Sequence, residues 1–472
     1  MTRSSSEFTR RNLLKTVLFG SALPLASQGS IAADAPAGSG RKVRGVIFMV
    51  SDGMSPGVLT LAEAYSKLTR NRGTRWWQLY SDPKAARGLM DTASASSLVT
   101  DSAAASSAWG SGKRIANGVI NIDSEGKELT PIAAVLKRKP QTRIGLVTTA
   151  TVTHATPAGF AAAVPDRDLE DLIAPQYRDR VDLILGGGAK FFSRESRTDG
   201  HELWDDFSKS GYQVVRDRDG LLNSQSAKLL GIFSKGHLPF EIDRIHNSEL
   251  AKSVPTLKEM ASAAVGRFLS QDQPFLLQIE GARIDHAAHL NDIAALLGEQ
   301  LAFDDAVAAV LEAVAGRDDL LVVVTSDHGN SNPGLIGVGE AYSQSTEAFA
   351  KIQRAQVSHE SLITAWKASE DRDPSRLAAR VEMGLGVLLK DAEAAALAEV
   401  FASGHAAEWN HQLANPEGLL GQFCGNHTGI GWVGTTHTTD PTLISVIGPQ
   451  AERFNGMVVN SKVFEHLVEL LG

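Results

Sequence analysis

Acidic and histidine side chains gather directly behind three short apolar runs of the sequence. Asp52 follows the first run, and the segment 280–289 follows another, bringing a glutamate, an aspartate and two histidines. Asp327 and His328 come after a third run, Leu320–Thr325. Burying a carboxylate requires a cation or hydrogen bonds, so these strand ends are candidates for metal binding. Each of them, taken singly, could equally be a capped strand end.

Spacing within the segment 280–289 sharpens this hypothesis. Asp285 and His289 are four residues apart, so one helical turn places both side chains on the same face. A carboxylate with an imidazole suits zinc and leaves a position open for substrate. A solvated helix start explains the same residues about equally well.

A candidate nucleophile lies in the segment from Thr100 to Trp109. Thr100 and Asp101 precede an alanine-rich run, which predicts a helix start with Ser102 in its first turn. Free N–H groups and the helix dipole there favour a serine alkoxide or a phosphate. From this segment alone, an ordinary capping role is the stronger interpretation.

The elements that must position these residues are short apolar runs that alternate with helical stretches such as Leu296–Val314. Runs of this length and composition predict strands buried on both faces. The class is therefore α/β, with a large, mixed, mostly parallel central sheet covered by helices on both faces. In such sheets ligands bind beyond the carboxyl ends of the strands. The runs are Val43–Val50, Arg143–Thr148, Val181–Leu185, Phe275–Ile279, Leu320–Thr325 and Leu443–Ile447.

The alternation is interrupted between residues 334 and 426, where helical patterns such as Leu377–Leu389 and Ala392–Ala402 dominate. We interpret this stretch as a cap or crown-like insertion. The expected organisation is a leader over 1–33, a linker over 34–41, a catalytic core over 42–333, the insertion over 334–426 and a return to the core over 427–472.

The first residues have the order of a secretory signal. Basic residues precede a short, weakly apolar stretch, Thr16–Ala26, which leads to small residues near Ala33. The pair Arg10–Arg11 resembles a twin-arginine export signal, the alternative being an ordinary basic leader. We expect an exported protein, periplasmic or secreted, without a transmembrane anchor, because no apolar run reaches about 20 residues.

Charge and cysteine usage exclude several kinds of partner. The chain carries a formal net charge of −8, and the leader contributes +3, so the remainder carries −11. Such a surface has no general attraction for nucleic acid or an anionic membrane. With Cys424 as its one cysteine, the chain forms no internal disulfide. Because the net charge is negative, an anionic substrate would need a local positive charge, supplied by metal or by a placed arginine.

Taken together, the motifs resemble those of the alkaline phosphatase family. They occur in the same order as in the family, from about Val46 to Gly456. The matching segments are Asp52-Gly53, Thr100-Asp101-Ser102-Ala103-Ala104, His154-Ala155-Thr156-Pro157-Ala158 with Arg167, Glu280-Gly-x-x-Ile-Asp285-x-x-x-His289, Asp327-His328-Gly329, and His437-Thr438 before Gly448-Pro449. Six motifs in register are hard to obtain by chance.

The resemblance implies a phosphate monoesterase with a phosphoserine intermediate, two zinc ions and one magnesium ion. It implies that Ser102, activated by the second zinc, is the nucleophile and that Arg167 clamps the phosphoryl oxygens. The implied ligands are Asp285, His289 and His437 for one zinc, Asp52, Asp327, His328 and Ser102 for the other, and Asp52, Thr156 and Glu280 for magnesium. Asp101, His154 and His286 are secondary candidates. The implied partners are small phosphate monoesters and, as one option, a second copy of the chain.

Two departures from the family pattern affect these assignments. His154 and His286 stand where the enteric bacterial pattern has aspartate and lysine, and they look more like the animal members. His437 lacks the glycine that usually completes a His-Thr-Gly triplet, whereas His427-Thr428-Gly429 has it. We prefer His437 because a strand follows it at the expected spacing, with His427 as the competitor.

Three alternative functions stay open at this point. A sulfatase of the same superfamily is disfavoured, since the chain has no Cys/Ser-x-Pro-x-Arg motif. A phosphodiesterase of the superfamily usually has threonine as nucleophile and lacks the arginine clamp. A phosphate- or metal-binding protein without catalysis would not need every catalytic position filled, as it is here.

Overall fold

The computed structural model describes residues 42–139, 141–405 and 412–472. The predicted leader and linker lie outside the described residues. Within the described residues, every helix is too short or too polar to cross a membrane.

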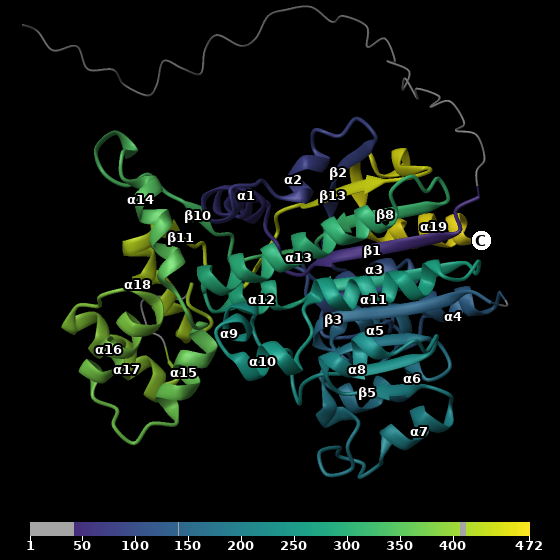
Figure 1. Cartoon of the computed structure of the whole chain (residues 1–472), viewed down its shortest axis with the longest axis horizontal. Helices are drawn as coiled ribbons and strands as arrows, with labels where there is room; N and C mark the ends of the chain where they lie inside the picture. The colour runs from purple at the N-terminus through teal and green to yellow at the C-terminus, as the bar shows by residue number, and fades with distance from the viewer. Residues whose placement is uncertain (1–41, 140, 406–411) are drawn as a thin grey trace, which may run out of the picture. The chain divides into compact units, whose positions relative to one another are not determined.

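A ten-stranded sheet runs through the centre of the described chain, in the order β14-β2-β13-β8-β1-β7-β3-β4-β6-β5 (Figure 1). The strands pair in parallel except at β13, which is antiparallel to both β2 and β8. The predicted mixed, mostly parallel sheet is therefore confirmed. Its strands are β1 Gly45–Ser51, β2 Ala85–Asp91, β3 Arg143–Thr151, β4 Leu183–Gly187, β5 Gln213–Val215, β6 Leu229–Ile232, β7 Phe275–Gly281, β8 Leu320–Thr325, β13 Thr442–Ile447 and β14 Gly456–Val459.

Helices cover both faces of this sheet, and the alternation of side chains along β1 shows why. Ile47 and Met49 belong to one apolar core, while Val46, Phe48 and Val50 belong to the other. With apolar neighbours on both faces, this strand has no polar side chain before Ser51, its last residue. The first core is closed by α1 Pro56–Arg70, α2 Arg75–Leu79, α8 Arg218–Asn223, α9 Glu241–Ile245, α11 Leu257–Leu269, α12 Arg283–His289 and α13 Ile293–Ala313. The second is closed by α3 Ser102–Ser111, α4 Ile132–Lys137, α5 Ala155–Ala161, α6 Ala174–Tyr177, α7 Leu203–Lys209 and α19 Asn460–Leu471.

A third apolar core belongs to the segment predicted to be an insertion. Leu377 and Leu397 are fully buried within it, among side chains of α15, α16, α17 and α18. We call α14 to α18 the helical region; they include the green helices of Figure 1. Its helices are α14 Ser345–Ala350, α15 His359–Lys367, α16 Pro374–Leu385, α17 Asp391–Ser403 and α18 Leu419–Thr428. A short antiparallel pair, β10 Gly334–Leu335 with β11 Ile430–Gly431, joins the two ends of this stretch. The boundaries at 334 and 426 stay predictions.

Candidate active site

Three adjacent central strands deliver the acidic side chains to one edge of the sheet. β1 lies between β7 and β8, and Val50 is in register with both Glu280 and Thr325. Asp52 therefore emerges beside Glu280 on one side and Asp327 on the other, and all three carboxylates are fully buried. The expectation that the strand ends converge at a single site agrees with this geometry.

The first carboxylate group consists of Asp52, Asp327 and His328. His328 Nε2 lies 3.1 Å from Asp327 Oδ2 and 3.6 Å from Asp52 Oδ1. Burial, and then the neighbouring negative charges, raise the pKa of Asp52 well above its usual value; burial also raises the pKa of Asp327, to about 7. Neither carboxylate oxygen of Asp52 has a hydrogen-bond partner. Crowded, unpartnered buried oxygens of this kind fit a bound cation.

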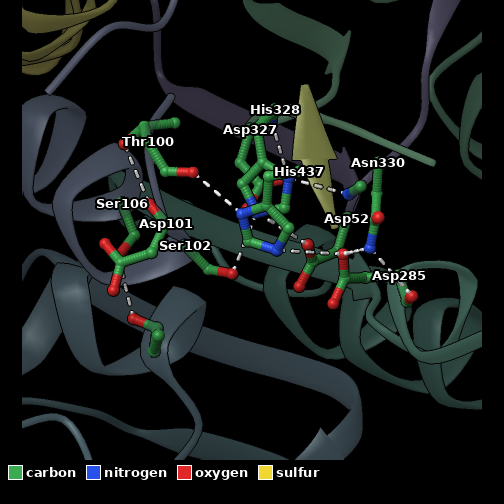
Figure 2. Close-up of polar contacts among 12 residues, drawn as sticks. Asp52, Thr100, Asp101, Ser102, Ser106, Asp285, Asp327, His328, Asn330 and His437 are labelled. Atoms are coloured by element: carbon green, nitrogen blue, oxygen red, sulfur yellow. Dashed lines mark hydrogen bonds and ion pairs between the residues drawn. The ribbon is translucent and has the colours of Figure 1, made fainter. Parts of the chain in front are cut away.

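Ser102 begins α3 beside this group (Figure 2). Asp101 caps the helix, its Oδ1 accepting a hydrogen bond from the Ala104 N–H at 2.8 Å. Ser102 Oγ is thereby held 3.1 Å from His328 Nε2, and the residue is 2% exposed. Asp101 is thus an N-cap, as the capping interpretation predicts, and the same helix start places Ser102 beside the metal-type group. A role for Ser102 as nucleophile stays a prediction.

The second metal-type group consists of Asp285, His289 and His437. His289 Nδ1 donates to the Thr435 carbonyl and His437 Nδ1 donates to the Thr100 carbonyl, both at 2.8 Å. A carbonyl can only accept, so each ring keeps its proton on Nδ1 and leaves Nε2 as a lone pair.

In the neutral rings these lone pairs would point at one another, so the group favours a bound cation. The Nε2 atoms of His289 and His437 are 3.1 Å apart, and they lie 3.3 and 3.5 Å from the Asp285 carboxylate. Although burial opposes it, the Asp285 charge raises the pKa of His289 to about 9, so a proton is held here in the absence of metal. Two imidazoles and a carboxylate are a donor set that zinc prefers.

The structure places His437 and its competitor His427 in different surroundings. His437 lies in β12 His437–Thr438, which pairs antiparallel with β9 Gly329–Asn330 directly after His328. Asn330 Nδ2 also donates to Asp285 Oδ1 at 2.7 Å. His427 lies instead on α18, and among the described residues no metal-type cluster contains it.

A third group surrounds Glu280. Thr148 Oγ1 donates to Glu280 Oε2 at 2.5 Å, while Glu280 Oε1 and Thr156 Oγ1 are buried without a partner. Burial raises the pKa of Glu280 to about 7. Asp52, Glu280 and His154 are close enough for one ion to contact all three. The free oxygens fit magnesium, which prefers an oxygen shell.

Arg167 extends over this part of the site. Its Nη1 lies 3.2 Å from Asp101 Oδ2 and its Nη2 donates to His154 Nε2 at 3.3 Å. A guanidinium can only donate, so His154 Nε2 is an acceptor and its proton is on Nδ1. Arg167 is thus held between the N-terminus of α3, which carries the serine, and that of α5, which carries Thr156.

A histidine that the sequence did not single out joins His154 and His286. The ring of His237 lies 4.5 Å from that of His286 and 5.8 Å from that of His154, and the rings of His154 and His286 are 5.5 Å apart. Burial, and then nearby guanidinium charges, lower the pKa of all three, that of His237 to about 4. A signal was present: His237 follows the apolar strand β6, just as the other site residues follow theirs.

Comparisons with known proteins identify relatives of this chain. A family model described as alkaline phosphatase matches residues 43–472. The crystal structure of Thermus thermophilus alkaline phosphatase superposes with a TM-score of 0.86 and 34% identity, covering 96% of each chain. Alkaline phosphatase 3 of Bacillus subtilis is 28% identical over 98% of both chains. A streptomycin-6-phosphate phosphatase of Streptomyces griseus is 32% identical, covering 66% of this chain and 80% of its own. The chain therefore belongs to the alkaline phosphatase family and is a hydrolase of that family.

Proposed function

We propose that this enzyme hydrolyses phosphate monoesters through a phosphorylated Ser102, with two zinc ions and one magnesium ion as cofactors. One observation carries the proposal. The buried Ser102 hydroxyl lies 3.1 Å from His328, in a group where both carboxylate oxygens of Asp52 and Oδ2 of Asp327 are buried without a hydrogen-bond partner. Arg167 forms an ion pair with Asp101, the residue before Ser102.

The three groups of side chains would hold the metals. Asp285, His289 and His437 suit one zinc. Asp52, Asp327 and His328 suit the other, with Ser102 Oγ beside His328. Asp52, Glu280 and Thr156 supply the oxygens for magnesium. When bound, these ions supply positive charge that lowers the pKa of the serine hydroxyl and of water.

Ser102 Oγ then attacks phosphorus as the bond from phosphorus to the leaving oxygen breaks. The alcohol leaves with a proton, and a water molecule later attacks the phosphoserine, which releases inorganic phosphate and regenerates the hydroxyl. Arg167 holds two phosphoryl oxygens with its planar fork. The first-turn N–H groups of α3 add positive potential at the same point. Since these groups bind the phosphoryl part of the substrate, we expect many monoesters to be accepted.

Covalent labelling tests this proposal. Ser102→Ala should keep its bound metals and lose activity on the order of 1,000-fold or more, because the attacking oxygen is gone. Ser106→Ala is the matched control, since Ser106 is buried on the same helix and its Oγ donates to the Ala155 carbonyl at 2.9 Å. Mass spectrometry of acid-quenched wild type should find phosphate on Ser102. Phosphate on another residue, or on none, would rule out the covalent route.

Assays on three ester classes separate the alternatives. A monoester, a diester and a sulfate ester compared under the same conditions should give a clear preference for the monoester. A preference for the diester or the sulfate ester would indicate a phosphodiesterase or a sulfatase. No turnover of any ester would indicate a phosphate- or metal-binding protein without catalysis.

We also propose that the enzyme is exported, periplasmic or secreted. The sequence of residues 1–33 supports this proposal, with Arg10–Arg11 as the export signal. Replacing both arginines by lysine should retain the enzyme inside the cell, as cell fractionation would show. Unchanged export would favour an ordinary basic leader.

A further inference from the structure

A buried arginine connects the site helix α12 to the helical region. Arg283 is 2% exposed, and its Nη2 donates to both carboxylate oxygens of Glu360 on α15 at 2.9 Å. Its guanidinium also lies over the ring of Phe240, 3.7 Å from the ring centroid. The ion pair, the aromatic contact and the burial together leave the guanidinium one orientation.

In that orientation Arg283 determines which nitrogen of His286 carries the proton. Arg283 Nη1 donates to His286 Nδ1 at 2.8 Å. Because a guanidinium has no acceptor, Nδ1 must be the lone pair, and the proton of the neutral ring is on Nε2. His286 is thereby a hydrogen-bond donor. Its ring packs against that of His154, which accepts from Arg167.

We infer that Arg283 and Glu360 are positioning residues, which hold His286 as an N–H donor for phosphate beside Arg167 and so make phosphate binding depend on the helical region. The inference rests on the proposed monoesterase function. Nothing in it requires Arg283 or Glu360 to contact the substrate. Their effect passes through the His286 imidazole.

Other contacts dock the same turn of α15 without contacting His286. Ser358 Oγ and Ser361 Oγ donate to Asp243 Oδ2 at 2.7 and 2.8 Å, and the His359 N–H donates to Asp292 Oδ2 at 2.6 Å. These contacts provide a matched control, because Ser361→Ala weakens docking of the helix while the Arg283–Glu360 pair is kept.

The test measures inhibition by inorganic phosphate in a double-mutant cycle on the metal-loaded, full-length enzyme. Glu360→Gln should raise the phosphate inhibition constant roughly fivefold, the size expected when one aligned hydrogen bond is lost. Ser361→Ala should leave the constant within about twofold of wild type. In a His286→Ala background, Glu360→Gln should have no further effect, because the group it positions is absent.

Two results would overturn the inference. One is an unchanged phosphate inhibition constant in Glu360→Gln. The other is an equal effect of Glu360→Gln with and without His286, which would show that the ion pair merely stabilises the fold. Thermal melting of each variant separates loss of folding from loss of phosphate binding. Glu360→Asp is a second substitution, which keeps the negative charge. If wild type itself lacks monoesterase activity, the proposed function fails instead.

Discussion

Two sets of histidines lie in this site, and the partner of one ring nitrogen separates them. In His289 and His437, a backbone carbonyl accepts from Nδ1, which leaves Nε2 as a lone pair for a cation. In His286 and His237, Nδ1 accepts from the Arg283 guanidinium and from the Thr151 N–H. Those rings carry their proton on Nε2 and can donate to an anion. The same residue type is thus set to present either a lone pair or an N–H group, according to what its other nitrogen binds.

Metal removal tests the first set most strongly. We expect EDTA to abolish activity, and zinc with magnesium to restore it. Without metal, the crowded donors around Asp285 and those around Asp52 are left without a cation. Full activity after verified removal of metal would contradict the assignment.

A substitution within the first set sharpens the same test. His437→Ala should lose one zinc and at least about 100-fold in activity, since one lone pair of the group is gone. His427→Ala is the matched control, because His427 lies on α18 outside the metal-type clusters of the described residues. Metal analysis and monoester turnover measure both variants. If His427→Ala lost the zinc and the activity while His437→Ala kept both, the zinc ligand would be His427.

Arg167→Ala should have the next largest effect. We expect about 100-fold weaker monoester turnover and weaker inhibition by phosphate, the scale seen when one oxyanion donor is removed. A diester offers one fewer charged oxygen to the arginine, so its turnover should fall less. Equal losses on both substrates would show that Arg167 does not clamp the phosphoryl group.

The smallest effect concerns His154, which belongs to neither set completely. It could join Asp52 and Glu280 around one ion, yet the Arg167 donor fixes its proton on Nδ1. A neutral ring adds no negative charge to the magnesium shell, so purified enzyme should gain activity when magnesium is added. His154→Asp should reduce this gain, as a titration with magnesium would reveal. A wild type saturated without added magnesium, together with an identical variant, would refute the prediction.

Much of this arrangement could be predicted from local sequence. Apolar strands that end in carboxylates place Asp52, Glu280 and Asp327 at one edge, because parallel strands share their direction. The four-residue spacing of Asp285 and His289 predicts their common helical face. Such arguments require only periodicity and strand polarity.

Tertiary contacts explain what could not be predicted. His237 meets His286, and Glu360 meets Arg283, only after separate elements have packed; Glu360 and Arg283 are 77 residues apart in sequence. The strand β2 was also missed, since its sequence includes Arg87 and Gly88 and lacks a continuous apolar run. Its strand character comes from pairing with β13 and β14.

The contact between His437 and the Thr100 carbonyl spans 337 residues of chain. Closing a loop of that length carries an entropy cost that the folded core offsets, so we expect this contact to form late in folding. A chain still being synthesised already contains the nucleophile, the arginine and most of the acidic side chains, but it lacks His437. If His437 is a zinc ligand, the enzyme should therefore be inert until β12 has paired with β9. Catalysis would thus wait for a contact that the chain supplies 337 residues after Thr100.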